Sequence, residues 1–205
     1  MPIIRKATDS DLNAIVSIHI SAFRGFFLSM LGDRFLRELY HGFLLNVDSI
    51  FLVSVHDGFV TGFAVGAVNP GGFFHKLLKD RWFYLLVGAI PGLLRHPIVV
   101  GRKLLSALIY RGDQPPQTGV GALLSSLAVA PAFAKSGIGE SLVKMFIASA
   151  KQIGATHVYL TTDRFQNESV NRFYIRQGFK VECSFVKAGK REMNRYILYI
   201  ESESQ

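Results

Sequence analysis

The chain has 205 residues, of which 49% are hydrophobic and 19% charged. This length fits one domain, or one domain that carries a large insertion, and the hydrophobic fraction excludes intrinsic disorder as the general state of the chain. The single cysteine, Cys183, excludes an internal disulfide, and no Cys/His pair has the spacing of zinc ligands. We therefore expect a protein without a structural metal, in a reducing, cytoplasmic location.

The net charge of +8 is concentrated in one segment. Residues 76–111 contain seven Lys and Arg residues against one Asp, interleaved with aromatic and aliphatic side chains. Such a segment could attract phosphate-bearing ligands, an anionic membrane surface or nucleic acid, or it could simply be the solvated face of an inserted helix. Its longest uncharged apolar run, residues 82–94, is shorter than the about 20 residues that a membrane-spanning helix needs.

The first part of the chain predicts a strand, two helices and a β-hairpin. The expected bounds are 2–6 for the strand, 12–19 and 33–45 for the helices, and 49–56 and 59–68 for the hairpin strands. An aromatic, glycine-containing connection at 23–31 separates the two helices. The pair Asp57-Gly58 between the two β-rich runs favours a tight hairpin turn.

The second part predicts an insertion followed by alternating strands and helices. Turn-forming residues at 69–72 and 113–119 delimit the segment 69–119, which we interpret as an insertion of two helices, 76–95 and 98–111. The remaining elements are expected as a buried strand at 123–129, a helix that starts near Gly137 and stops at Gly154, a strand at 157–162, a helix at 167–177 and two closing strands at 179–187 and 194–201.

The junction between the buried strand and the next helix carries a Gly-x-Gly turn, Gly137-Ile138-Gly139. Glycines at such a junction let successive backbone N–H groups approach an anion, and the first helical turn adds unpaired N–H donors and the positive end of its dipole. Pyrophosphate would fit there, although a tight structural turn has the same sequence. The turn lacks the Lys of a Walker loop and the three glycines of a dinucleotide fingerprint.

A second pattern follows about thirty residues later. The run Val129-x-Pro-x5-Gly137-x-Gly139, together with Asn167-x-x-Val-x-x-Phe173-Tyr174-x-x-x-Gly-Phe, resembles the acetyl-CoA-binding core of the GNAT superfamily of N-acyltransferases. The resemblance covers the core elements on both sides of the insertion. It implies an α/β (α+β) fold in which helices flank a mixed, mostly antiparallel central sheet, with the helical insertion placed before the central strand, in a single domain spanning 1–205.

The resemblance also implies where acetyl-CoA, as co-substrate, would bind. The backbone of Leu127, Ala128 and Val129 would pair with the pantetheine arm. The residues around the pyrophosphate would be Lys135, Ser136, Gly137, Ile138, Gly139 and Glu140. Ala134 departs from the family pattern, which commonly has Gln or Arg there, so one side-chain donor is missing; Lys135 or a basic residue of the insertion could replace it.

The resemblance also implies catalytic and cofactor-binding roles for residues of the helix expected at 167–177. Tyr174 takes the position of the general acid, Asn167 anchors the helix near the cofactor, and Phe173 belongs to the same cofactor-binding group. A phenol with a pKa near 10 can donate its proton to the departing CoA thiolate. The alternative for Phe173 and Tyr174 is an aromatic pair in the core.

The general base and the acceptor stay open at this point. The central strand presents Ser125 and Ser126 where many family members have a carboxylate, so water chains ending on Asp163 or His19 are the candidates. The aromatic connection 23–31 and the basic insertion, acting as a lid, favour a small-molecule amine that carries phosphate, such as a nucleotide-linked amino sugar of surface-polysaccharide synthesis. A tRNA, a protein amino terminus and a simple small amine stay open as other acceptors. The competing class is a non-catalytic module that docks on a membrane or nucleic acid through 76–111, with nucleic acid less favoured. Either a monomer or a homodimer is expected.

Overall fold

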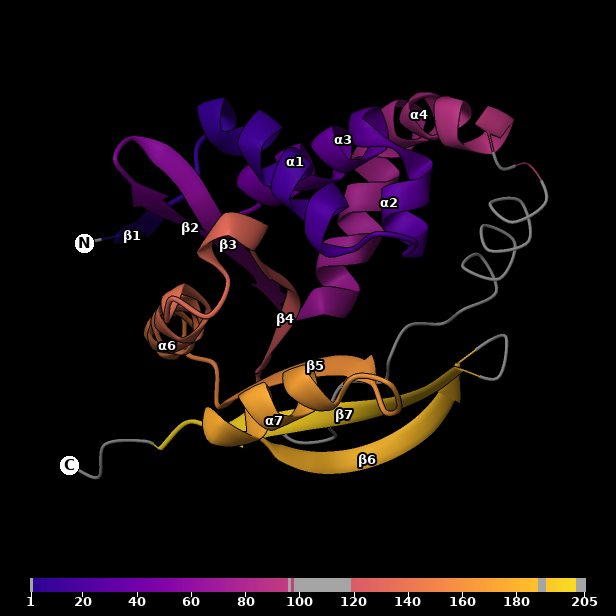
Figure 1. Ribbon diagram of the computed structural model, residues 1–205. Coiled ribbons are helices and arrows are strands. Elements are labelled where there is room, and N and C mark those ends of the chain that lie inside the picture. The colour runs from indigo at the N-terminus through magenta and orange to yellow at the C-terminus, as the bar shows by residue number, and fades with distance from the viewer. Residues whose placement is uncertain (1, 96, 98–118, 188–190, 202–205) are drawn as a thin grey trace.

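The computed structural model describes residues 2–95, 97, 119–187 and 191–201, and within them seven strands form one mixed sheet of order β1-β2-β3-β4-β5-β7-β6 (Figure 1). Only the central pair, β4 and β5, is parallel, and the other described pairs are antiparallel. The strands are β1 (Ile3–Lys6), β2 (Ser49–His56), β3 (Phe59–Val68), β4 (Gly121–Val129), β5 (His157–Asp163), β6 (Lys180–Lys187) and β7 (Arg191–Tyr199).

Helices cover both faces of this sheet. Their bounds are α1 (Leu12–Ala22), α2 (Phe27–Leu31), α3 (Asp33–Leu44), α4 (Pro70–Arg95), α6 (Ile138–Gln152) and α7 (Glu168–Arg176). Figure 1 shows α1 to α4 gathered together, with α6 and α7 apart from them. Alternation along β2 explains the two layers: Phe51 and Val53 pack with α1, α3 and α4, whereas Ile50 and Leu52 pack with α6.

A bulge interrupts the pairing of β3 with β4. Val65 lies opposite Ser126 and Gly66 lies opposite Leu124, so that Ser125 is the extra residue. A Cβ atom at Gly66 would lie 1.9 Å from the carbonyl oxygen of Leu123, which means that only glycine allows β3 to approach β4 so closely. The bulge therefore bends β4 in its middle.

The predicted fold class and most of the predicted elements are confirmed. Asp57 and Gly58, with φ of 50° and 80°, form the expected hairpin turn. The short helix α2 within residues 23–31 was not predicted. Several boundaries were wrong: α1 ends at Ala22 rather than 19, the first inserted helix begins at Pro70 rather than 76, β4 begins at Gly121 rather than 123, and β7 begins at Arg191 rather than 194. Pro70 can begin α4 because the first residues of a helix have no intrahelical partner for their N–H groups, so the missing N–H of proline costs no hydrogen bond there. The predicted helix 98–111 lies outside the described residues.

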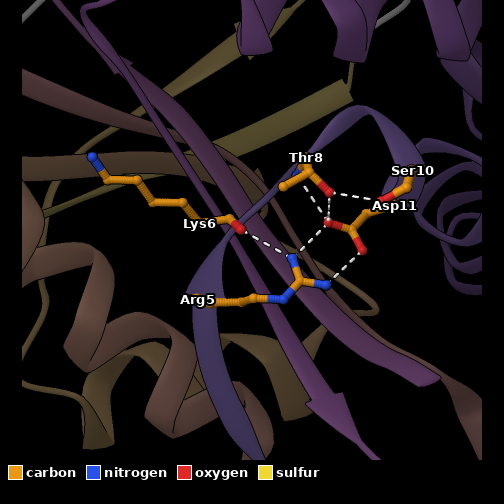
Figure 2. A network of polar contacts seen from close by, with 5 residues as sticks. All are labelled: Arg5, Lys6, Thr8, Ser10 and Asp11. Atoms are coloured by element: carbon orange, nitrogen blue, oxygen red, sulfur yellow. Dashed lines mark hydrogen bonds and ion pairs between the residues drawn. The ribbon is translucent and has the colours of Figure 1, made fainter. Parts of the chain in front are cut away.

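A buried carboxylate joins the first strand to the first helix (Figure 2). The Arg5 guanidinium donates to both Asp11 carboxylate oxygens at 2.7 and 2.8 Å, while the Thr8 backbone N–H and hydroxyl each donate to Oδ2 at 2.8 Å. Asp11 is only 5% exposed. These donors, the Arg5 hydrogen bond first, lower the pKa of Asp11 to about 2.

We expect Asp11→Asn to lower the free energy of unfolding by about 1–2 kcal/mol at pH 7. Because the folded-state pKa lies below the unfolded value, the carboxylate's contribution is present above about pH 4 and is lost as the pH falls toward 2. Urea titrations at several pH values measure the difference. The matched control is Asp9→Asn, at an exposed carboxylate of the same turn; an equal loss in both variants would contradict the role of the network.

Candidate active site

A cavity of about 550 Å³ opens where the two parallel strands part. β4 and β5 pair only over residues 121–123 and 157–159. Beyond these residues the cavity separates them, lined by residues 124–127 of β4 and 160–163 of β5. On its β5 side this stretch of β4 therefore has backbone N–H and C=O groups that none of the described strands pairs.

One wall of this cavity is aromatic. It comes from the end of α1 and from α2, with His19, Phe23, Phe26 and Phe27 among the lining residues. The Phe23 ring lies 4.7 Å from the His19 ring and 5.8 Å from the Phe26 ring, between centroids. These contacts place flat apolar surfaces beside the polar residues of β4.

The predicted pyrophosphate turn follows directly at the end of β4. Lys135 and Gly137 adopt positive φ values of 63° and 83°, and Gly137 is the N-cap of α6. A Cβ atom on Gly137 would meet nothing within 4 Å, so the glycine serves the backbone angle and the space over the turn is open. The first N–H groups of α6 have no intrahelical partners, which leaves them available to an anion in that space.

The side chains of this turn support its shape. The Ser136 hydroxyl donates to the Phe133 carbonyl at 2.6 Å, and the buried Ile138 side chain anchors the first residue of α6 in the core. Gly139 lies against Phe173 and Val129, where an added Cβ would be 3.7 Å from each. The Glu140 carboxylate pairs with Lys144 at 2.7 Å.

The other predicted residues sit on α7 and at its start. The Asn167 side-chain amide donates to the Thr162 hydroxyl at 2.7 Å and to the Asp163 carbonyl at 3.2 Å, which ties the start of α7 to the end of β5. Asn171, which the sequence analysis missed, adds a bond of 3.1 Å to the same carbonyl. Both asparagines fix α7 beside the cavity.

Tyr174 is the residue of α7 on which the predicted chemistry depends. It lines the cavity, is 8% exposed, and its ring packs against Phe179 and Tyr196. Burial raises the pKa of Tyr174 above the usual value near 10, so its hydroxyl keeps its proton at neutral pH. The Tyr174 ring therefore packs in the core while the residue also lines the cavity, and its role as general acid stays a prediction.

A buried chain of three polar side chains connects α1, α3 and β4. His19 Nδ1 is 2.6 Å from the Tyr40 hydroxyl, and Tyr40 forms a hydrogen bond with Ser126, a cavity residue of β4. Burial lowers the pKa of His19 to about 4, which makes the imidazole neutral at pH 7. Within the described residues its Nε2 is buried and has no hydrogen-bond partner. Tyr40 has the helical spacing of a core residue, and this spacing does not indicate its polar contacts.

Asp163, the second candidate base, is engaged in an ion pair. The Arg191 guanidinium donates to both of its carboxylate oxygens, and Arg191 also lies over the Phe26 ring at 5.1 Å from its centroid. Both partners line the cavity, together with Lys187. This end of the cavity is therefore charged, and the β6–β7 hairpin supplies its basic groups.

The inserted helix does not reach this cavity in the part of the chain that the structure describes. No described residue of α4 lines it, so the expected lid finds no support in residues 70–95.

A second cavity, of about 610 Å³, lies on the other side of α1 and is lined by Arg24, Arg34 and Arg37. It contains none of the predicted site residues, and the cavity between β4 and β5 is therefore the candidate site. Among the described residues, no group of three or more His, Cys, Asp and Glu side chains is placed to hold a metal ion.

Comparison with known proteins agrees with this geometry. The family model described as the acetyltransferase (GNAT) family matches residues 12–179, which confirms the resemblance seen in the sequence. A search of curated proteins finds no significant match.

Several solved structures share the fold. A GNAT-family protein from Desulfovibrio desulfuricans is 17% identical, with 97% of this chain and 99% of that chain aligned and a TM-score of 0.63. A Salmonella typhimurium protein solved with its cofactor acetyl-CoA is 19% identical over 100% and 97% of the two chains, with a TM-score of 0.61. The ribosomal-protein-S18-alanine N-acetyltransferase of Escherichia coli is 14% identical over 100% and 97%, with a TM-score of 0.60.

The buried imidazole predicts a loss of stability in mild acid. Between the unfolded pKa of about 6.5 and the folded pKa of about 4, the unfolded chain binds a proton that the folded chain does not, so the free energy of unfolding falls as the pH falls through this window. We expect His19→Gln to remove up to about 3 kcal/mol of this dependence. Denaturation at pH 7 and pH 4.5 measures it, with His41→Gln on the outer side of α3 as control. A His19 variant with the parental pH profile would contradict the buried, neutral imidazole.

Proposed function

The chain belongs to the acetyltransferase (GNAT) family, and from that premise we propose that it moves the acetyl group of acetyl-CoA to a primary amine bound in the cavity between β4 and β5. One observation carries the proposal. Tyr174 of α7 lines the cavity where β4 and β5 separate, and the neighbouring Phe173 lies against Gly139 in the open turn at the start of α6. A donor lying along β4 would have its phosphates at the turn and its sulfur near Tyr174.

In this proposal the backbone of β4 binds the pantetheine arm. Leu127, Ala128 and Val129 lie beyond the last residue that pairs with β5, so their groups on that side can bond the amides of an extended ligand as another strand would. Lys135 to Glu140 then receive the pyrophosphate through backbone N–H groups and the end of the α6 dipole. Because Ala134 supplies no side-chain donor, this backbone contribution is the main one.

The reaction itself needs a neutral amine, a polarised thioester carbonyl and a proton for sulfur. The amine nitrogen forms a bond to the acetyl carbon, the carbon–sulfur bond breaks, and the Tyr174 hydroxyl donates its proton to the departing thiolate. The tyrosinate recovers a proton from the acylated nitrogen or from water. Tyr174 is protonated at neutral pH with or without the upward shift of its pKa, so its position among the lining residues of the cavity supports this role.

We assign the deprotonation of the amine to water at the mouth of the cavity. Asp163 is occupied by Arg191, and the lowered pKa of His19 makes it a weak proton acceptor at neutral pH. The serines of β4 remain as hydrogen-bond partners for the incoming amine, with the Ser126 hydroxyl held by Tyr40.

For the acceptor, we propose an amine on a ring-shaped, phosphate-bearing molecule such as a nucleotide-linked amino sugar. The aromatic wall of Phe23, Phe26 and Phe27 supports a flat ring, and Lys187 with Arg191 supports a nearby negative charge. The Escherichia coli enzyme named above acts on a protein alanine, so peptide amino termini belong in the same acceptor panel. Release of free CoA thiol with each acceptor tests the proposal.

We expect Gly137→Val to abolish acetyl-CoA binding while the chain stays folded. A β-branched side chain opposes the positive φ and fills the open space in which the pyrophosphate would sit. Calorimetric titration and the shift of the melting temperature with acetyl-CoA measure binding. Gly154→Val is a matched control, since Gly154 also has a positive φ and open space but lies at the other end of α6. Normal binding by the Gly137 variant would overturn the assignment, and binding of liposomes without any acetyl-CoA effect would favour the non-catalytic module.

We expect Tyr174→Phe to lower turnover by about 10²–10⁴ while acetyl-CoA binding changes little. The ring still packs against Phe179 and Tyr196, so only the proton donor is lost. Turnover is followed by thiol release under conditions where chemistry limits the rate. Tyr199→Phe, at the exposed end of β7, is the control. Unchanged turnover would mean that Tyr174 has a packing role and does not donate the proton.

A further inference from the structure

The outer face of α4 is apolar although it is exposed. Toward the protein the helix buries small and apolar residues, among them Leu85, Gly88, Ala89 and Gly92. On the remaining surface its large side chains are well exposed. These residues are Leu78 (58%), Trp82 (59%), Phe83 (57%), Tyr84 (56%), Leu86 (57%), Val87 (42%), Ile90 (45%), Leu93 (39%) and Leu94 (77%).

Four of these residues share one side of the helix. Phe83, Leu86, Ile90 and Leu94 follow one another at intervals of three and four residues, so their side chains form one stripe, and Trp82 lies beside it. A helix at the surface of a globular protein normally has charged and polar residues on this side. A contiguous apolar stripe of this kind marks a contact surface.

The charges around this stripe are basic. Lys76 and Lys79 are exposed before it and Arg95 after it, while Asp80 is the one acidic residue of α4. Arg81 points the other way and pairs with Glu38 of α3. An apolar face with aromatic residues and flanking Lys and Arg is the pattern of a helix that lies in the interface of an anionic bilayer.

We propose that α4 docks this outer face on an anionic phospholipid surface, with Trp82, Phe83 and Ile90 in the interface and Lys76, Lys79 and Arg95 on lipid phosphates. The helix lies on the bilayer and does not cross it: none of the described helices has the length and apolar character of a membrane span. This proposal does not depend on the acetyltransferase reaction.

The basic charge around the outer face of α4 favours an anionic bilayer over two other occupants, a second copy of the chain and residues 98–118. A second copy related by twofold symmetry would bring the same basic groups toward one another, and like charges across an interface oppose association. Residues 98–118 of this chain contain Arg102, Lys103 and Arg111 against Asp113, so they too would add positive charge to a basic face. An anionic surface is the occupant that complements it.

Trp82 is the single tryptophan of the sequence, which makes its fluorescence a direct reporter of this face. We expect vesicles of phosphatidylcholine with phosphatidylglycerol to shift its emission to the blue, and brominated lipid in those vesicles to quench it. Phosphatidylcholine vesicles alone should bind the full chain at least about tenfold more weakly, and added salt should weaken binding to the anionic vesicles.

Two variants and one control complete the test. Phe83→Gln with Ile90→Gln should weaken vesicle binding at least about tenfold, and Lys76→Gln with Lys79→Gln should remove most of the preference for anionic lipid. The control, Val47→Gln with Phe59→Gln, changes two exposed apolar side chains on other elements and should bind as the parent does. Acetyl-CoA binding shows that each variant is folded; if the parent does not bind acetyl-CoA, circular dichroism replaces it.

Three results would overturn the proposal. One is binding that is equal for the Phe83/Ile90 variant and the control. Another is a dimer of the parent in sedimentation that is a monomer in the Phe83/Ile90 variant but still a dimer in the control. The face would then bind a second copy of the chain. The third is unshifted, unquenched Trp82 fluorescence with anionic vesicles.

Discussion

The separation of β4 from β5 is the constraint on which the site depends. A parallel pair that continued past residues 123 and 159 would use the backbone groups of both strands and leave no space between them. The bulge at Ser125 bends β4 where this pairing stops, and Gly66 on β3 allows the bend because any side chain there would collide with Leu123. One glycine on a neighbouring strand thus contributes to a cavity that it does not line.

The two parted strands then position different parts of the proposed site. β4 is followed, after a short 3-10 helix at Pro131–Phe133, by the turn at Gly137, where the positive end of the α6 dipole lies. β5 ends at Asp163, whose backbone carbonyl accepts bonds from Asn167 and Asn171 and so fixes the start of α7. Since α7 presents Tyr174 to the cavity and Phe173 to Gly139, it brings together the turn proposed to bind an anion and the proposed proton donor, which belong to different segments.

The sequence predicts local structure well and the polar contacts poorly. Glycine and proline punctuation, the Asp57-Gly58 turn and the helical spacing before Tyr174 all report short-range preferences, which the structure bears out. The bond between His19 and Tyr40 joins residues on two helices, and each has the spacing of an ordinary core residue. The pairing of Asp163 with Arg191 likewise depends on how the β6–β7 hairpin returns past β5. Such contacts depend on tertiary packing, which a residue pattern does not encode.

The packing of α4 connects its outer face to the cavity. Added Cβ atoms would lie 3.0 Å from the backbone of Phe35 at Gly88 and 2.4 Å from the carbonyl oxygen of Met30 at Gly92, so both glycines let α4 rest directly on α2 and the start of α3. Phe27, in the first turn of α2, lines the cavity. One short helix therefore separates the apolar face of α4 from the aromatic wall.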